Sequence, residues 1–301
     1  MKVALIRELS KENIEKVRRC GVEVVQGVDY DADIVLVKSR IDHFHKYKNL
    51  KWIHTSFTGV NSILTDEVKA SKVIITNSKD NYGTQVPEHA IAMILAFNRR
   101  LKEAFIAQQN KVWKEFDATE LYGKTVGIIG LGVIGTGVAK IFKTFGCRVI
   151  GTSRNIKKNR YVDKIVPIRS LEILLSESDY VVLCVPLTRE TRHLIGKKEL
   201  EYMKKSSILI NISRGEVVDE KALIDALKKG KIKGSGLDVF ETEPLHKKSP
   251  LWLMKNVIIT AHYAGVTQHQ ESRAVDLFCK NLKLFLKGKK LINVVDKEKG
   301  Y

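Results

Sequence analysis

The stretch that decides the fold of this chain reads Val126-Gly127-Ile128-Ile129-Gly130-Leu131-Gly132-Val133-Ile134-Gly135. It is an apolar strand pattern that ends in G-x-G-x-x-G and runs directly into an amphipathic helical pattern over 134–145. This order of strand, glycine turn and helix is typical of the first βαβ unit of a dinucleotide-binding domain. Gly130 permits the tight turn, Gly132 leaves room for a pyrophosphate, and Gly135 lets the helix approach the strand. The alternative is that the three glycines serve only strand–helix packing.

The residues after the glycines extend this unit into a complete sheet. Apolar strand patterns recur at 148–151, 180–185, 208–212, 234–239 and 257–260, with amphipathic helical patterns between them, including 197–203 and 220–229. Together with the strand before the glycines these make six strands, and their alternation with helices predicts a doubly wound parallel sheet. The N–H groups of Val133 and Ile134, at the start of the first helix, are the expected phosphate donors.

The first hundred residues predict a second parallel sheet. Strand patterns lie at 2–6, 22–26, 34–37, 52–55 and 73–76, and a helical pattern over 11–19 follows the N-cap candidate Ser10. Another helical pattern has Pro87 in its first turn and continues to Leu101. The helical tail over 268–287 has no strand partner left in the later sheet, so we expect it to pack against the first one. The predicted domains are therefore 1–96 with 268–301, and 97–267 inserted between them.

Composition limits the possible partners. The 301 residues carry a formal charge of +18, but the lysines are spread along the chain, without an aromatic-interleaved basic stripe, so we expect no nucleic-acid site. No apolar stretch reaches eighteen residues, and the first four apolar residues are too few for a signal peptide, which predicts no membrane segment and a cytoplasmic location. The four scattered cysteines are expected to be core thiols. His43 and His45 have no third ligand nearby, and we predict no metal.

The strand over 148–151 is followed by the residues expected to contact the 2′ position of the cofactor's ribose. An NAD-binding domain places a carboxylate about twenty residues beyond the glycines, but this chain has Ser153 and Arg154 there. Serine and arginine bind a 2′-phosphate, whereas a carboxylate would repel it. We therefore predict NADP as the preferred cofactor, with NAD possible. The alternative is that Arg154 is an ordinary surface arginine.

Three later strand ends carry residues suited to reducing a 2-oxo acid. Each follows an apolar strand and so lies at the carboxyl edge, where open parallel sheets bind their ligands. Arg214 suits the substrate carboxylate, because a guanidinium binds it with two hydrogen bonds. His262 suits protonation of the carbonyl oxygen, because imidazole changes charge near neutral pH, and Glu243 suits orienting that histidine. Each residue alone is more often a salt bridge or a cap, but three at the ends of strands in one sheet favour an active site.

The chain resembles the D-isomer-specific 2-hydroxyacid dehydrogenase family from about Trp52 to Val295. The resemblance rests on the glycine turn and three further motifs, namely Glu120-Leu121-Tyr122-Gly123-Lys124-Thr125-Val126-Gly127, Ile212-Ser213-Arg214-Gly215-Glu216-Val217-Val218-Asp219 and Gly236-Leu237-Asp238-Val239-Phe240. It implies that Arg214 binds substrate, that His262 is the acid/base, and that Glu243 pairs with it. Glu243 is favoured over Glu241 because the family's glutamate immediately precedes a proline.

The resemblance also implies further site residues. Thr58 and Gly59 match the loop that binds the substrate carboxylate through backbone N–H groups, although Asn61 stands where the family usually has aspartate. Tyr82 falls in the stretch that shapes the substrate pocket, or is a core aromatic. The remaining cofactor-side positions are Val185, Pro186, Ile212, Asp238 and Gly265, with Asp238 matching the residue that binds the nicotinamide carboxamide.

Taken together, these features predict an α/β protein of two Rossmann-like doubly wound parallel-sheet domains: a flavodoxin-like substrate domain and an inserted NAD(P)-binding domain. The expected activity is hydride transfer between NADP(H) and a small 2-oxo acid such as glyoxylate, hydroxypyruvate or pyruvate, in a homodimer, as in the glyoxylate/hydroxypyruvate reductase branch. Two alternatives stay open. One is a phosphite or formate dehydrogenase of the same superfamily, although formate dehydrogenases usually have glutamine in place of Glu243. The other is a non-enzymatic dinucleotide-sensing scaffold.

Overall fold

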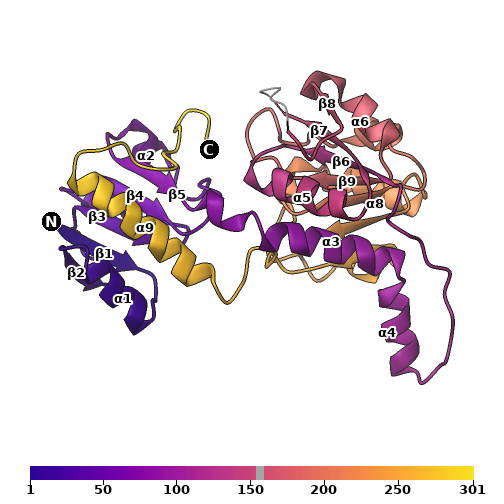
Figure 1. The fold of residues 1–301 in the computed structure, drawn as a ribbon, viewed down its shortest axis with the longest axis horizontal. Coiled ribbons are helices and arrows are strands. Elements are labelled where there is room, and N and C mark those ends of the chain that lie inside the picture. The colour runs from indigo at the N-terminus through magenta and orange to yellow at the C-terminus, as the bar shows by residue number, and fades with distance from the viewer. Residues whose placement is uncertain (154–158) are drawn as a thin grey trace. The chain divides into compact units, whose positions relative to one another are not determined.

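The structure, a computed structural model, describes residues 1–153 and 159–301. The chain forms two compact units. Unit 1 contains Met1–Tyr82 and Val266–Tyr301, and unit 2 contains Gly83–Gly265. Both are α/β units (Figure 1). All pairings between their labelled strands are parallel, as the alternation of strands and helices predicted.

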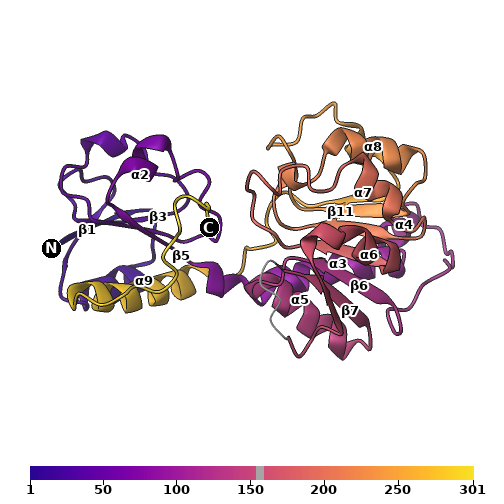
Figure 2. The same ribbon diagram turned by 90° about the horizontal axis from the view of Figure 1, so that it is seen from above.

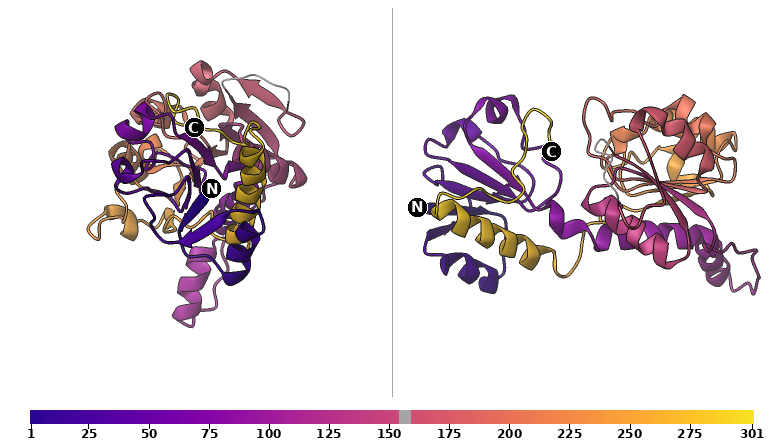
Figure 3. Two further views of the ribbon diagram at one scale, coloured as in Figure 1. Left: turned by 90° about the vertical axis from the view of Figure 1, so that its left-hand side faces the viewer. Right: turned by 45° about the horizontal axis from the view of Figure 1, so that its top comes forward.

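Unit 1 has a five-stranded sheet in the order β2-β1-β3-β4-β5, the flavodoxin-like order. Its strands are β1 (Lys2–Ile6), β2 (Glu23–Gln26), β3 (Ile34–Val37), β4 (Trp52–Thr55) and β5 (Ile74–Asn77). Its helices are α1 (Lys11–Arg18), α2 (Asp66–Ala70) and α9 (Gln270–Leu286), with short 3-10 turns at Phe44–Lys46 and Lys79–Tyr82. Figures 2 and 3 show α2 and α9 on opposite faces of the sheet.

The tail helix α9 completes the core of unit 1. Phe278 stacks on Trp52 of β4 with ring centroids 5.1 Å apart, and Phe285 lies 5.5 Å from the same ring. Val294 also forms an antiparallel bridge with Thr76. The predicted return of the C-terminal helix to the first sheet is therefore confirmed.

Unit 2 has a seven-stranded sheet in the order β12-β11-β10-β9-β6-β7-β8. Numbered within the unit, this is 7-6-5-4-1-2-3, the Rossmann order with one more strand at its end. The strands are β6 (Thr125–Ile129), β7 (Arg148–Thr152), β8 (Lys164–Val166), β9 (Tyr180–Leu183), β10 (Ile208–Asn211), β11 (Gly234–Leu237) and β12 (Val257–Ile259).

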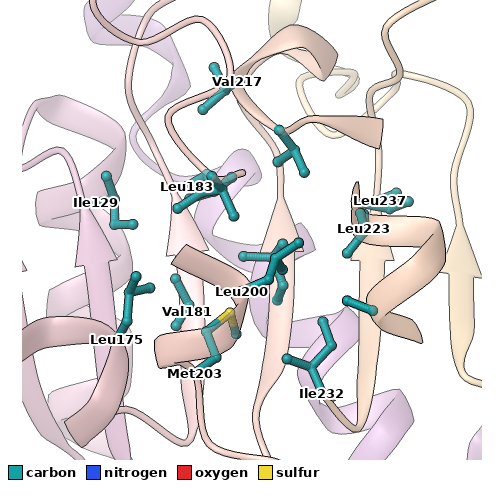
Figure 4. Packing of buried hydrophobic residues seen from close by; sticks show 14 of the residues in the cluster. Ile129, Leu175, Val181, Leu183, Leu200, Met203, Val217, Leu223, Ile232 and Leu237 are labelled. Atoms are coloured by element: carbon teal, nitrogen blue, oxygen red, sulfur yellow. The ribbon is translucent and has the colours of Figure 1, made fainter. Parts of the chain in front are cut away.

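The helices of unit 2 cover both faces of this sheet. They are α3 (Gln85–Asn98), α4 (Leu101–Gln109), α5 (Val133–Thr144), α6 (Leu171–Glu177), α7 (Lys197–Tyr202) and α8 (Glu220–Lys228), with 3-10 turns at Ile168–Ser170, Gly215–Val217 and Pro250–Leu253. Figure 4 shows how Leu200 of α7 and Met203, which directly follows this helix, lie over the strand residues Val181 and Leu183. Within the described part of the chain, no helix has the length and apolar character needed to cross a membrane.

Three details differ from the sequence-based expectation. The compact units separate at Tyr82/Gly83, whereas the predicted boundary at 96/97 falls inside α3, which packs on α5 and β10 of unit 2. The pattern continued to Leu101 as one helix, but α3 ends at Asn98 and Arg100 takes a left-handed φ of 56° before α4 begins. The edge strand β8 was not predicted, because its three residues are too few to show a period.

Candidate active site

The glycine turn has the predicted geometry. β6 ends at Ile129, and Gly130 has a φ of 101°, in the region that favours glycine. A Cβ on Gly135 would lie 1.9 Å from the Gly130 carbonyl oxygen, so α5 and the turn are in direct contact. A Cβ on Gly132 would have no protein atom within 4 Å. Packing therefore explains Gly130 and Gly135, whereas the space at Gly132 is open to a ligand.

The first turn of α5 begins at this open space. Gly132 is the N-cap residue, and the Thr136 N–H donates to its carbonyl at 2.8 Å. The N–H groups of Val133, Ile134 and Gly135 come before that bond and have no acceptor inside the helix. They make the helix N-terminus a site for an anion, and the described residues there fit a pyrophosphate.

Arg214 is positioned by the loop that follows β10. The Asn211 side chain closes this loop: its amide donates to the Arg214 carbonyl at 2.9 Å, and its oxygen accepts from the Ser213 N–H at 3.1 Å. The guanidinium Nη1 donates to the Ser213 carbonyl at 2.6 Å. A Cβ on Gly215 would lie 1.8 Å from the Phe240 carbonyl carbon, so this loop presses directly on the loop after β11.

Glu243 and His262 form a hydrogen-bonded pair. Glu243 Oε2 lies 2.6 Å from His262 Nδ1, and Oε1 accepts the Phe240 N–H at 3.0 Å. Burial alone would raise the pKa of Glu243, but the bonds from His262 and Phe240, with the charges of His262 and Arg214, lower it below its ordinary value. The carboxylate therefore stays ionised, and it is within electrostatic range of both His262, the partner predicted for it, and Arg214.

Glu241 has a different partner. It lies 2.8 Å from His193 Nε2 and accepts the Glu220 N–H at 3.2 Å. Its carboxylate therefore links the segments that carry His193 and Glu220. The preference for Glu243 over Glu241 as the partner of His262 agrees with these contacts.

The His262 backbone is held in an unusual conformation. Its φ is 54°, a left-handed value that costs a residue other than glycine about 1 kcal/mol or more. Its N–H donates to the Asp238 carbonyl at 2.8 Å, which fixes this turn. Nδ1 is occupied by Glu243, and Nε2 makes no hydrogen bond to any described residue. The free nitrogen of an exposed imidazole is thus available for proton transfer.

Asp238 organises the loop that carries His262. Its side chain is 2 % exposed and accepts the Thr260 hydroxyl at 2.6 Å and the N–H groups of Tyr263 and Ala264 at 3.0 Å each. His89 of α3 lies 2.9 Å from the Thr260 hydroxyl and 3.6 Å from Asp238, and burial lowers its pKa. No local pattern indicates this link, because His89 lies 149 residues from Asp238 along the chain.

Comparison with known proteins identifies the family of this chain. The family model described as "D-isomer specific 2-hydroxyacid dehydrogenase, NAD binding domain" matches residues 91–264. The glyoxylate reductase of Thermococcus gammatolerans is 38% identical over 304 residues, which cover 97% of this chain and 88% of that protein. The chain belongs to the D-isomer-specific 2-hydroxyacid dehydrogenase family. It is an NAD(P)-dependent oxidoreductase of the glyoxylate/hydroxypyruvate reductase-like kind.

Further relatives agree with this assignment to the D-2-hydroxyacid dehydrogenases. The glyoxylate reductase of Pyrococcus furiosus is 36% identical and covers 97% of this chain and 87% of its own. A D-isomer-specific 2-hydroxyacid dehydrogenase of Xanthobacter autotrophicus, solved with NADPH and MES, has a TM-score of 0.89 at 28% identity and covers 100% and 99% of the two chains. An NADPH-dependent glyoxylate/hydroxypyruvate reductase of Sinorhizobium meliloti, solved with NADP and sulfate, has a TM-score of 0.87 at 27% identity, with the same coverage.

The other positions predicted to bind the cofactor follow strands of unit 2. Val185 and the exposed Pro186 follow β9, and the Pro186 carbonyl accepts the Thr191 hydroxyl at 2.6 Å. Ile212 follows β10 and is buried, and the Gly265 carbonyl accepts the Gln85 amide at 3.5 Å. Ser153 directly follows β7 and is half-buried, whereas Arg154 lies outside the described residues.

The predicted substrate-loop residues belong to unit 1. The Thr58 carbonyl accepts the Asn77 amide at 2.8 Å, and Thr58 and Gly59 are half-buried. Tyr82 is 5 % exposed, donates its hydroxyl to the Ser56 carbonyl at 2.9 Å and accepts from Gln270 at 3.2 Å. This burial favours the core-aromatic alternative for Tyr82. Residues 1–153 and 159–301 contain no group of three or more side chains arranged to hold a metal ion.

Proposed function

We propose that this dehydrogenase reduces a small 2-oxo acid, such as glyoxylate, hydroxypyruvate or pyruvate, to the D-2-hydroxy acid with NADPH as the preferred donor. The observation that carries the proposal is the 2.6 Å pair between Glu243 and His262 on a loop next to Arg214. An ionised carboxylate, an imidazole with one free nitrogen and a guanidinium are the groups that this reduction requires.

Each of the three residues has one task in the proposed reaction. Arg214 binds the substrate carboxylate and draws electron density from the carbonyl. His262 donates the proton from Nε2 to the carbonyl oxygen, and Glu243 holds the ring through Nδ1 and stabilises its charged form. When bound, the nicotinamide supplies the hydride that adds to the carbonyl carbon. In the direction of oxidation, neutral His262 takes the hydroxyl proton back.

The cofactor would be held at the carboxyl edge of the sheet of unit 2. Gly132 and the N–H groups of Val133 and Ile134 would take the pyrophosphate, because only there does the glycine turn leave space that no side chain fills. The adenosine side would be lined by Val185 and Pro186, and the nicotinamide side by Ile212, Asp238 and Gly265. Asp238 already accepts three hydrogen bonds, so its carboxylate is fixed before any ligand arrives.

Preference for NADP is supported by the residues at the end of β7. Ser153 stands where an NAD-specific domain has a carboxylate, and Arg154 follows it. A serine hydroxyl and a guanidinium together donate to and neutralise a 2′-phosphate. The structural relatives from Xanthobacter autotrophicus and Sinorhizobium meliloti were solved with NADPH and NADP, respectively.

A homodimer is supported by the exposed apolar side chains of α4 and the segment after it. None of the α4 residues is buried, and Figure 1 shows this part of unit 2 projecting from the unit. Trp113 is 98 % exposed, and a monomer would leave the whole indole in water. A two-fold dimer brings the same patch of two copies together and buries it. The apolar residues of the patch are Leu101, Phe105, Ile106, Val112 and Trp113.

A cytoplasmic location is also part of the proposal. All four cysteines, Cys20, Cys147, Cys184 and Cys279, are free thiols, which a reducing compartment preserves. Unit 1 is proposed as the substrate-binding domain, with Thr58 and Gly59 in its substrate loop.

The activity is tested by following NADPH oxidation with a panel of 2-oxo acids. Glyoxylate, hydroxypyruvate and pyruvate are each supplied with NADPH and, separately, with NADH. We expect turnover of at least one acid with NADPH and a D-configured product wherever the product is chiral. Binding of NADPH without turnover of any 2-oxo acid would instead support the dinucleotide-sensing scaffold.

A further inference from the structure

Arg7 is a half-buried cation in unit 1 whose Nε donor has no partner among the described residues. It directly follows β1 and is half-buried. Its Nε is fully buried and has no hydrogen-bond partner among the described residues. Burial lowers the pKa of this guanidinium, and only the charges of Glu271 and Tyr82 act to raise it. Leaving a buried donor unpaired destabilises the folded state, and the effect is larger for a charged group.

Glu271, the carboxylate whose charge raises the pKa of Arg7, already accepts hydrogen bonds from other residues. Glu271 Oε1, at the start of α9, accepts the Ser10 N–H at 2.8 Å and the Asn13 amide at 2.6 Å. Glu271 and Arg7 form no ion pair within 4.0 Å, although the charge of each affects the pKa of the other. The carboxylate therefore offsets part of the cost of burying the cation, but it does not fill the hydrogen-bonding positions of the guanidinium.

The strand register places Arg7 at the edge that carries the predicted substrate loop. Ile6 is paired with Val37, and Val37 with Thr55, so Arg7 and Ser56 leave the sheet at the same level. Two strand spacings, about 10 Å, separate them, which an extended arginine side chain can largely span. Arg7 also lies within electrostatic range of Tyr82, whose hydroxyl binds the Ser56 carbonyl at 2.9 Å. The Thr58 hydroxyl at this edge is likewise buried, with no partner in the described part of the chain.

We propose that Arg7 is the centre of an oxyanion subsite at the carboxyl edge of the unit 1 sheet, and that it selects 2-oxo acids with a second anionic group. The ligand chemistry is a carboxylate or phosphate oxygen, because a planar guanidinium binds either with two parallel hydrogen bonds. Thr58 supplies a hydroxyl to the same ligand. The inference rests on the proposed reduction of 2-oxo acids and names which of them the enzyme prefers.

The first test is a substrate panel on the full-length enzyme with NADPH. Glyoxylate carries no second anion, oxaloacetate adds a carboxylate, and 3-phosphonooxypyruvate adds a phosphate, so the last two distinguish the two sources of oxyanion. Wild type is expected to favour at least one of them over glyoxylate. Arg7→Met should lower kcat/KM for that acid by roughly 10- to 100-fold, the worth of a charged hydrogen bond, and change it for glyoxylate less than threefold. Arg19→Met, which removes an exposed arginine paired at 3.9 Å with Glu15, is the matched control and should change neither value.

The second test does not depend on turnover. Phosphate and malonate are titrated into the protein without cofactor, and the melting temperature is measured. We expect stabilisation of wild type and of Arg19→Met by at least one of the two anions, and none of Arg7→Met. Without anions, Arg7→Met should melt no lower than wild type, because it removes a buried charge that has no direct partner. A much lower melting temperature, or equal losses with all three acids, would show that Arg7 is structural and would overturn the proposal. A wild type that binds these anions but reduces no 2-oxo acid would refute the proposed activity alone.

Discussion

The glycine turn allows two substitutions, three residues apart in the motif, to separate folding from cofactor binding. Gly135→Ala places a methyl carbon 1.9 Å from the Gly130 carbonyl oxygen, well inside the ordinary contact distance. The backbone must move, at a cost of about 1–3 kcal/mol for overpacking, of which the better helix propensity of alanine returns about 1 kcal/mol. In a unit of this size, a net loss of about 1 kcal/mol lowers the melting temperature by about 2–4 °C.

Gly132→Ala should have the opposite profile. Gly132 has an ordinary φ of −76°, and the added methyl group meets no protein atom within 4 Å. The change in stability should stay within about 1 kcal/mol, the size of an N-cap effect. The methyl group would occupy the space proposed for the pyrophosphate, and we expect the Kd for NADPH to rise at least tenfold, about 1.4 kcal/mol.

The assays are thermal unfolding without ligand and titration of NADPH followed by its fluorescence. We predict that Gly135→Ala loses stability and that Gly132→Ala loses affinity for NADPH while keeping its melting temperature. If Gly132→Ala bound NADPH as tightly as wild type, the pyrophosphate would not lie at this turn. If Gly135→Ala melted like wild type, the contact between α5 and the turn would not be as close as described.

Three other perturbations test separate parts of the account. Arg154→Asp should raise KM for NADPH far more than KM for NADH, and equal losses would remove the 2′-phosphate argument. Burial lowers the pKa of His54 to about 3, so as the pH falls the unfolded chain takes up the proton of this histidine before the folded chain does. The free energy of unfolding, measured in urea titrations, should therefore fall as the pH drops below about 6.5, by about 3 kcal/mol between pH 7 and pH 4.5. His54→Asn should reduce this loss. Phe105→Glu in the patch around α4 should give a monomer in sedimentation equilibrium, whereas an unchanged mass would exclude that patch as the dimer contact.

Regular elements of this chain were predictable because their patterns are long or fully buried. The strands β1, β3 and β4 have the predicted bounds, and β3 is a continuous, fully buried apolar run between Asp33 and Lys38. The break between α3 and α4 was not predictable, because Arg100 supplies the left-handed turn where glycine or asparagine is the usual signal. No sequence pattern indicates that an arginine will adopt a left-handed backbone conformation.

The site shows the same division. Arg214, Glu243 and His262 follow strands of one parallel sheet, so topology alone brings them to one edge, and a short motif is enough to find them. The supporting contacts cross the chain at long range: His89 reaches the Thr260 hydroxyl, and Gly215 presses on Phe240. Such contacts depend on which helix lies against which strand end, and a single sequence does not encode them in any local pattern.

The most direct test of the central claim compares turnover and NADPH affinity of His262→Gln with those of wild type. Glutamine keeps a polar side chain of similar length but cannot donate a proton as an imidazolium does. His246→Gln is the matched control, because His246 is an exposed histidine of the same unit whose side chain accepts only the Lys248 N–H. We predict that His262→Gln loses a factor of about 10²–10⁴ in kcat with an unchanged Kd for NADPH, and that His246→Gln behaves as wild type. A His262→Gln enzyme that turns over within threefold of wild type would contradict the assignment of the proton donor.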